Sequence, residues 1–229
     1  ILTEIDNKAV KLTEANNQLV LNEFLETRET IYDTCFALND KTFHMQFYQW
    51  FIAEGIPERL LTVNTPYILS FLEGGAQNLL ALTDLLWLYH AKRENYFNAA
   101  QILYELSILE FPLLLTQRIE YLLRSIGFCN CACIPTLRQK MIRLLAVVQE
   151  LFDVANVQMD ILYTIKEDDR ISTPNKEIGT SSLDGKVLDI LDLFNQYTDP
   201  LGYYDLCLII FDVSEYRNSD DILKRWELY

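Results

Sequence analysis

The chain has 229 residues, half of them apolar, and it carries 33 acidic against 19 basic side chains, a net charge of −14 at neutral pH. So acidic a surface repels phosphate groups, which argues against direct nucleic-acid binding and against broad contact with anionic membranes. No apolar run reaches the roughly 20 residues that a membrane-spanning helix requires, so we expect no membrane insertion.

The two ends and the cysteines add two expectations. The chain begins with Ile1 rather than Met and ends on the apolar run up to Tyr229, so we expect it to be a segment of a longer protein. Its cysteine count, five, is odd and modest. Free, buried thiols in a cytosolic or nuclear protein are the default interpretation of such a count.

The first third of the chain predicts three helices. Apolar residues recur at helical spacing throughout, and Gly and Pro are few, which predicts an all-α protein. Asp40 is placed to cap the second helix, which is expected to end at Gly55. Thr65 and Pro66 are expected to be the N-cap and first position of the third helix. The glycine pair at 74–75 is expected to end it.

The clearest pattern is a pair of helices within residues 76–108. The run AQNLLALTDLLWLYHAKR has one apolar stripe that includes Leu79, and ENYFNAAQILYELSI follows at once with Asn95 as its expected cap. The small side chains of Ala99 and Ala100 would let the two helices approach closely. Such pairs stack into solenoids, so we predict an α-solenoid of stacked antiparallel pairs, about ten helices in one segment over residues 1–229.

A long helix is expected in the middle of the chain. The run LLLTQRIEYLLRSIGF predicts a helix that stops at Gly127, and the cysteine stretch follows it. Thr136 and Gln139 then have the spacing of a capping box. The apolar stripe that follows this box continues to Leu162, which predicts a helix of about 30 residues and ~45 Å.

The last part of the chain contains a predicted loop and further helices. Residues 166–182, KEDDRISTPNKEIGTSS, have no apolar period, and we expect a mobile exposed loop. A helix is expected over residues 183–197, with a break at 199–200. The run YYDLCLIIFDV fits either a strand or a buried helix; because no partner strand is in sight, we predict a helix. A last helix opens at residues 219–221 with acidic residues at its positive end.

The stretch CNCACIP, with Cys129, Cys131 and Cys133, is the strongest candidate for chemistry. Structural zinc needs four tetrahedral ligands, commonly two Cys-x-x-Cys pairs or cysteines with histidines. Here the spacing is Cys-x-Cys, no fourth ligand lies nearby in sequence, and a redox Cys-x-x-Cys motif is absent. We therefore expect no metal and no cofactor, and we interpret the cysteines as small apolar side chains in a helix-to-helix connector.

Other motifs also have structural interpretations. GTSSLDGK, residues 179–186, lacks the spacing of a phosphate-binding loop and is expected to start a helix capped by Ser181 or Ser182. The acidic pairs at 168–169 and 220–221 indicate solvated charge. Neither acidic pair is expected to act as a catalytic pair of carboxylates.

Two single residues complete the search for a site. His90 lies among aromatic residues, which favours a packed histidine over a catalytic base. Thr173 precedes Pro174 and so resembles a proline-directed phosphorylation site, a weak and common pattern. The sequence therefore predicts no catalytic residue, and it does not mark a partner-binding surface.

Two stretches resemble a known family. YHAKRENYFNAAQILYELS (89–107), followed by QRIEYLLRSIGF (117–128), and then LFNQYTDPLGYYDLCLIIFDVSEY (193–216), closely resemble the C-terminal region of the large inner-ring scaffold nucleoporins, fungal members above all. The resemblance covers most of residues 82–226. Residues 1–81 are similar only in the order and helical character of their elements.

The resemblance implies an architectural role. Members combine an N-terminal β-propeller with a C-terminal α-solenoid, and they build the inner ring of the nuclear pore complex at the nuclear envelope. The implied partners are other nucleoporins, including flexible linker nucleoporins. No catalytic residue carries over, because the family has none. The membrane contact of the family belongs to the propeller, which this chain lacks.

Alternatives to this interpretation are a vesicle-coat or other adaptor subunit, which shares the physics of stacked helix pairs, and an enzyme with an unrecognised site. One further expectation concerns the last predicted helix, whose apolar stripe is Ile222, Leu223, Trp226 and Leu228. We expect the parent protein to continue beyond it, and the isolated chain to self-associate through it.

Overall fold

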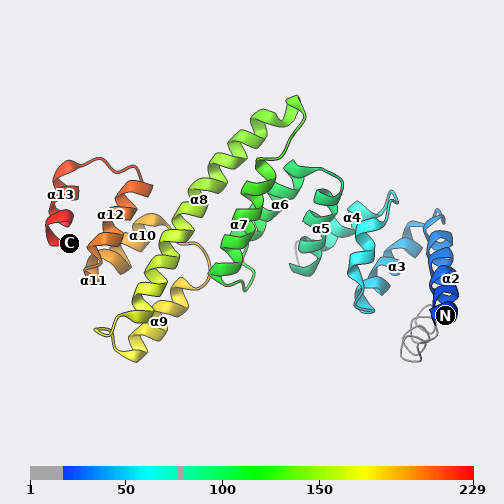
Figure 1. The fold of residues 1–229 in the computed structure, drawn as a ribbon, viewed down its shortest axis with the longest axis horizontal. Coiled ribbons are helices and arrows are strands. Elements are labelled where there is room, and N and C mark those ends of the chain that lie inside the picture. Colours follow the sequence, from blue (N-terminus) through cyan, green and yellow to red (C-terminus); the bar gives the residue numbers. More distant parts are fainter. Residues whose placement is uncertain (1–17, 77–79) are drawn as a thin grey trace. The chain divides into compact units, whose positions relative to one another are not determined.

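The computed structural model describes residues 18–76 and 80–229, and every regular element within them is a helix (Figure 1). The predicted all-α class is therefore confirmed. The described residues contain twelve α-helices, α2 to α13, together with a 3-10 helix and a π-helix. They form two compact units, and the chain passes from the first to the second between Tyr89 and His90. A single solenoid segment over residues 1–229 stays a prediction, and its residues 1–17 and Leu79 lie outside the described part.

The bounds of the helices are as follows. The first unit contains α2 (Gln18–Phe36), α3 (Lys41–Ala53), the 3-10 helix η1 (Pro57–Thr62) and α4 (Ile68–Ala76), and the boundary between the units falls in α5 (Leu80–Lys92). The second unit contains α6 (Tyr96–Ile108), α7 (Leu115–Cys129), α8 (Pro135–Glu167), α9 (Thr173–Leu183), α10 (Ile190–Leu193), the π-helix η2 (Phe194–Thr198), α11 (Asp199–Leu201), α12 (Tyr204–Val213) and α13 (Ser219–Leu228).

In the first unit, the predicted start and end of α3 are confirmed, and the predicted start of the next helix is wrong. The side chain of Asp40 accepts hydrogen bonds from the N–H groups of Thr42 and Phe43, so it caps α3 as predicted. Gly55, at φ +73°, lies in the left-handed region just after α3, where glycine avoids a steric cost. The predicted cap at Thr65 is wrong: its hydroxyl pairs with the hydroxyl of Tyr48, and α4 begins three residues later.

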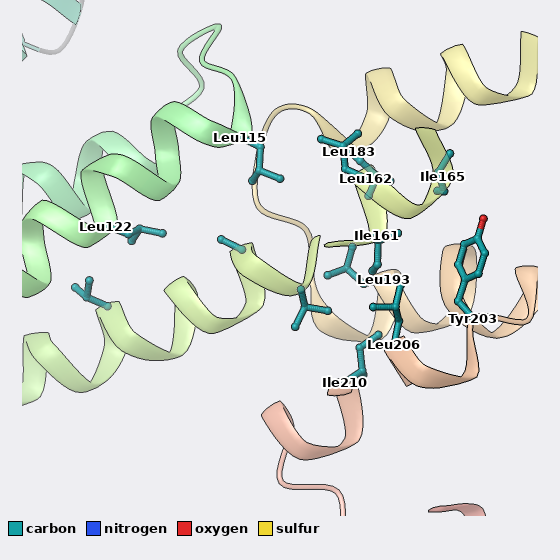
Figure 2. Packing of buried hydrophobic residues seen from close by; sticks show 13 residues of the cluster. Leu115, Leu122, Ile161, Leu162, Ile165, Leu183, Leu193, Tyr203, Leu206 and Ile210 are labelled. Atoms are coloured by element: carbon teal, nitrogen blue, oxygen red, sulfur yellow. The ribbon is translucent and has the colours of Figure 1, made fainter. Parts of the chain in front are cut away.

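Successive helices of the second unit pack on one another, α6 on α7 and α7 on α8. The main apolar cluster gathers fully buried side chains of α7, α8 and α9 with those of α10 and α12 (Figure 2). Ala100 of α6 is buried against Cys129 and Met141, and Ser125 donates to its carbonyl oxygen at 2.8 Å. The small residue at 100 thus brings α6 close to α7 and α8, whereas the sequence pattern predicted that it would bring α6 close to the preceding helix.

The connector between α6 and α7 is held by a buried arginine. Arg118 is 3% exposed; its Nη1 donates to the carbonyl oxygens of Ser107 and Leu109, and its Nη2 donates to that of Phe111. Beside it, Gln117 accepts a hydrogen bond from the N–H of Leu114, just before α7. The neighbours Gln117 and Arg118 therefore satisfy backbone groups that the two helix ends leave unpaired.

A buried glutamine holds the connector between α9 and α10. Gln158 of α8 is fully buried, and its amide nitrogen donates to the carbonyl oxygens of Leu183 (2.7 Å) and Lys186 (2.9 Å). Its amide oxygen accepts from the N–H of Leu188 at 2.7 Å. One side chain thus satisfies the carbonyl group of the last residue of α9 and two backbone groups of the connector that follows it.

The predicted loop over residues 166–182 is wrong for most of its length, since residues 173–183 form α9. Pro174 lies in the first turn, where its missing N–H costs nothing. Leu183 is fully buried in the main cluster, so packing on α8 stabilises a helix whose own sequence has little apolar period. The helix expected over 183–197 is right from residue 190 onward, where α10 and η2 lie, and wrong before it, because residues 184–189 form the connector bound by Gln158.

Other predicted helix ends shift for local reasons. The capping box at Thr136 is wrong, because α8 already begins at Pro135 and no side chain caps it. The helix α7 passes through Gly127 to Cys129. The break expected at residues 199–200 does not occur there: the π-turn of η2 leads directly into α11, which includes Pro200 and ends before Gly202 at φ +73°. A π-turn changes the hydrogen-bond register, which lets a helix continue into a proline.

The end of α8 carries a charged junction. The guanidinium of Arg170 donates to both carboxylate oxygens of Asp168, and the hydroxyl of Tyr203 donates to Oδ2 at 2.8 Å. These hydrogen bonds, from Arg170 first and then from Tyr203, hold the pKa of the Asp168 carboxyl well below its usual range. The expectation of solvated charge is wrong for Asp168, whose side chain is 9% exposed, and right for Asp169, which is fully exposed.

Replacing Gln158 with Met should destabilise the chain by about 2–4 kcal/mol, because three buried backbone groups would lose their partner. Urea unfolding followed by circular dichroism measures the change. Gln149→Met alters an exposed side chain of the same helix and should change stability by less than about 0.5 kcal/mol. Equal effects of the two substitutions would contradict the role of Gln158.

Replacing Asp168 with Asn should reduce the loss of stability on acidification. Because folding lowers the pKa of Asp168, its contribution is complete above the unfolded-state pKa of about 3.9 and is lost as pH falls through that value toward the folded pKa. The unfolding midpoint in urea should therefore fall more for the unmodified chain than for Asp168→Asn between about pH 6 and about pH 3. Asp169→Asn is the control, and an equal pH dependence of all three chains would contradict the assignment.

Candidate interaction surface

The cysteine stretch forms a packed connector and not a cluster of ligands. Cys129 is the last residue of α7 and is buried, whereas Cys131 and Cys133 are half-buried in the connector to α8. Burial raises the pKa of the Cys129 thiol to about 11, which keeps it protonated and poorly reactive at neutral pH. Across the part of the chain that the structure describes, no three His, Cys, Asp or Glu side chains gather as a metal site would require.

The two histidines lie inside the protein. His44 is fully buried; its Nε2 is 2.7 Å from the carbonyl oxygen of Leu38 and its Nδ1 is 3.2 Å from the hydroxyl of Tyr48. His90 is 6% exposed in α5, in agreement with the packed histidine predicted for that position. Inside the first unit, His44 thus pairs with a backbone carbonyl on one side of its ring and with a tyrosine hydroxyl on the other.

The remaining sequence motifs end up at helix termini. Residues 179–186 form the last turn of α9 and the start of the next connector, so the helix start expected there is wrong. Asp220 and Asp221 lie in the first turn of α13, and Asp221 accepts hydrogen bonds from Tyr216 and Asn218. Thr173 is the exposed first residue of α9.

Two hollows of the second unit share a lining residue. The α8 hollow, about 430 Å³, lies over α6, α8 and the connector before α10, and the α12 hollow, about 280 Å³, lies between α10–η2 and α12–α13. Ile190 lines both, so the two hollows adjoin, and we call them together the acidic groove. The residues that line the α8 hollow are Tyr104, Ile108, Val147, Glu150, Leu151, Val154, Val187, Leu188, Asp189 and Ile190. Those that line the α12 hollow are Ile190, Leu191, Phe194, Asn195, Ile210, Phe211, Ser214, Tyr216, Asp221 and Arg225.

The α12 hollow has an aromatic wall. The ring centroid of Phe211 lies 5.4 Å from that of Phe194 and 4.9 Å from that of Tyr216. Leu191 stands at the edge of the hollow with 66% of its surface exposed. Exposed apolar surface next to a hollow is typical of a site that binds another molecule.

Charge around the groove is predominantly negative. Glu150, Asp189 and Asp221 line it, and Arg225 is the cation among the lining residues. The Nη2 atom of Arg225 lies 2.7 Å from Oδ1 of Asp199, so its charge is already engaged. Residues 187–229 contain nine acidic and three basic side chains, which are Asp189, Asp192, Asp199, Asp205, Asp212, Glu215, Asp220, Asp221 and Glu227, and Arg217, Lys224 and Arg225.

A third hollow, the connector hollow, lies elsewhere on the second unit. It measures about 530 Å³ and is formed by the start of α6 and the cysteine stretch, with Tyr96, Phe97 and Cys133 in its lining. Ile134 stands at its edge and is 62% exposed. The cysteine stretch therefore shapes part of the surface of the second unit.

The apolar stripe predicted for the last helix lies on the surface of α13. Leu223, Trp226 and Leu228 are 57%, 63% and 53% exposed, while Ile222 is half-buried. The periodicity of the sequence sufficed to find this stripe. It did not reveal the acidic groove, because the groove combines residues from five α-helices, the π-helix η2 and two connectors, which are spread along the chain. Among the described helices, none has both the length and the apolar character needed to cross a bilayer.

Comparisons with known proteins agree with this architecture. The family model described as "Non-repetitive/WGA-negative nucleoporin C-terminal" matches residues 1–229. The chain is 41% identical over 206 residues to a probable nucleoporin of Schizosaccharomyces pombe, which covers 90% of this chain and 16% of that protein. It is 33% identical over 230 residues to nucleoporin NUP170 of Saccharomyces cerevisiae, which covers 99% of this chain and 15% of that protein. The chain thus spans about one sixth of the length of these relatives.

A solved structure supports the same assignment. The crystal structure of the Chaetomium thermophilum Nup170 CTD–Nup145N complex matches with a TM-score of 0.83 and 31% identity, over 90% of this chain and 40% of that one. Both the family model and the relatives confirm the family that the sequence motifs predicted. The chain belongs to the non-repetitive/WGA-negative nucleoporin C-terminal family, a family of nuclear pore proteins.

Proposed function

We propose that this chain is a structural, non-enzymatic part of the scaffold of the nuclear pore complex, where it binds other nucleoporins and so supports nucleocytoplasmic transport. The observation that carries the proposal is the match to the Chaetomium Nup170 CTD, which was crystallised with Nup145N, another nucleoporin. The vesicle-coat alternative has no support in the family match.

The fold suits this role physically. Helices that pack on their sequence neighbours expose much of their surface and their connectors, so partners can bind along an extended face. The acidic groove and the exposed stripe of α13 are two such surfaces in the second unit.

We further propose that linker nucleoporins are among the partners, and that the isolated chain self-associates through α13. The linker proposal is supported by the Nup145N complex of the Chaetomium relative. The self-association proposal is supported by the large apolar side chains of Leu223 and Trp226, more than half of whose surface is exposed to water.

Purification of the endogenous parent protein tests the scaffold role. Affinity capture followed by mass spectrometry should recover a set of nucleoporins, including the counterpart of Nup145N, because a scaffold segment is held by its neighbours. A parallel capture of an unrelated nuclear protein is the control. Recovery of vesicle-coat subunits in place of nucleoporins would contradict the proposal.

The double substitution Leu223→Glu with Trp226→Glu should abolish self-association of the isolated chain, since it places charge on the apolar stripe. Sedimentation velocity over a roughly hundredfold concentration range measures the association, and circular dichroism should show unchanged helicity. Leu123→Glu with Ile142→Glu, at exposed positions on α7 and α8, is the matched control. A monomeric unmodified chain over the whole range would overturn this part of the proposal.

A further inference from the structure

We propose that the acidic groove is the docking site for a linear protein segment in which large apolar side chains alternate with Lys or Arg. This inference rests on the proposed scaffold function and names the surface and the chemistry of one partner. The argument uses the shape of the groove, its apolar lining and its charge.

The shape of the groove favours a linear occupant. Its two hollows have volumes of about 430 and 280 Å³, each on the scale of one or two side chains, and they share Ile190. A chain that passes over Ile190 can place one side chain in each hollow, while its backbone stays at the surface. Extended or helical peptides bind folded domains in this way, with pockets that select side chains at intervals.

The lining requires apolar anchors. Phe194, Phe211 and Tyr216 form the aromatic wall of the α12 hollow, and Leu191 extends it onto the surface. Large apolar and aromatic side chains contribute most of the affinity in such interfaces, because they remove apolar area from water on both sides. A strongly polar segment would gain little here.

The charge of the groove selects basic flanking residues. Glu150 and Asp189 are exposed at the α8 hollow, and Asp221 lines the α12 hollow. Arg225, the cation of the lining, is engaged by Asp199 and does not offset these carboxylates. Lys or Arg next to the apolar side chains of the bound segment would be attracted to these carboxylates, whereas an acidic segment would be repelled by them.

Peptide binding to the intact 229-residue chain tests the site. The probes are fluorescein-labelled peptides of about 20 residues, overlapping along the Nup145N polypeptide of the Chaetomium complex, read by fluorescence anisotropy. Peptides that combine apolar and basic residues should bind, and their affinity should fall as NaCl rises from about 50 to about 500 mM. Binding of acidic peptides only, or of none, would overturn the proposal.

Substitutions locate the binding surface. Leu191→Lys changes an exposed groove residue and should weaken binding at least about tenfold, because it removes an apolar contact and repels a basic peptide. Ile134→Lys makes the same change at the edge of the connector hollow and should alter affinity less than about twofold. Weakening by Ile134→Lys and not by Leu191→Lys would assign the peptide to the connector hollow and overturn the proposal.

A second pair isolates the charge. Glu150→Lys lies in the groove, and Asp153→Lys lies on the same helix outside it, at an exposed position. The first should weaken peptide binding several-fold more than the second and should flatten the dependence on salt. Equal effects would overturn the electrostatic part. If no groove variant affects peptide binding, the groove is not the docking site. The scaffold role would still stand if affinity capture with Leu191→Lys in the parent protein recovers nucleoporins.

Discussion

The hydrogen bonds of Gln158 determine how the second unit closes. A connector between helices carries backbone groups that no helix satisfies, and burying them without partners is costly. Gln158 binds Leu183, Lys186 and Leu188 at once, so the segment after α9 lies against the long helix α8. Leu188 and Ile190 consequently line the acidic groove, and the position of that surface depends on a buried amide.

The same principle operates at two other connectors. Arg118 donates to three carbonyl groups, one in the last turn of α6 and two in the connector that follows. Burial lowers the pKa of its guanidinium. Asp168 binds Arg170 and Tyr203 where α8 ends. The QR pair of the QRIEYL run supplies Gln117 and Arg118, so one of the stretches that carry the resemblance also holds a connector. Polar side chains thus fix these turns of the second unit.

Regular helices form the apolar core of the second unit, whereas an irregular helical turn shapes part of its surface. Apolar side chains of α7, α8, α9, α10 and α12 form the main cluster, which stabilises the second unit (Figure 2). The α12 hollow instead depends on a local irregularity, the π-turn of η2, which carries Phe194 and precedes Pro200. A π-turn at a binding surface is a known association in proteins. Here it lets one helical segment continue through a proline and present an aromatic side chain beside α12.

The sequence alone determined the all-α class, the long helix α8, the cap at Asp40 and the stripe of α13, because helical periodicity and capping are local properties of neighbouring residues. The tertiary structure decided the rest. Residues 173–183 form α9 because Leu183 is buried against α8. Asp168, which was expected to be a solvated charge, instead binds Arg170 and Tyr203 at the end of α8. A glutamine on the apolar stripe of α8 was a visible signal for Gln158, but its three partners lie 25 to 30 residues away. The acidic groove is assembled from helices separated along the chain, and periodicity within one helix carries no information about which faces meet.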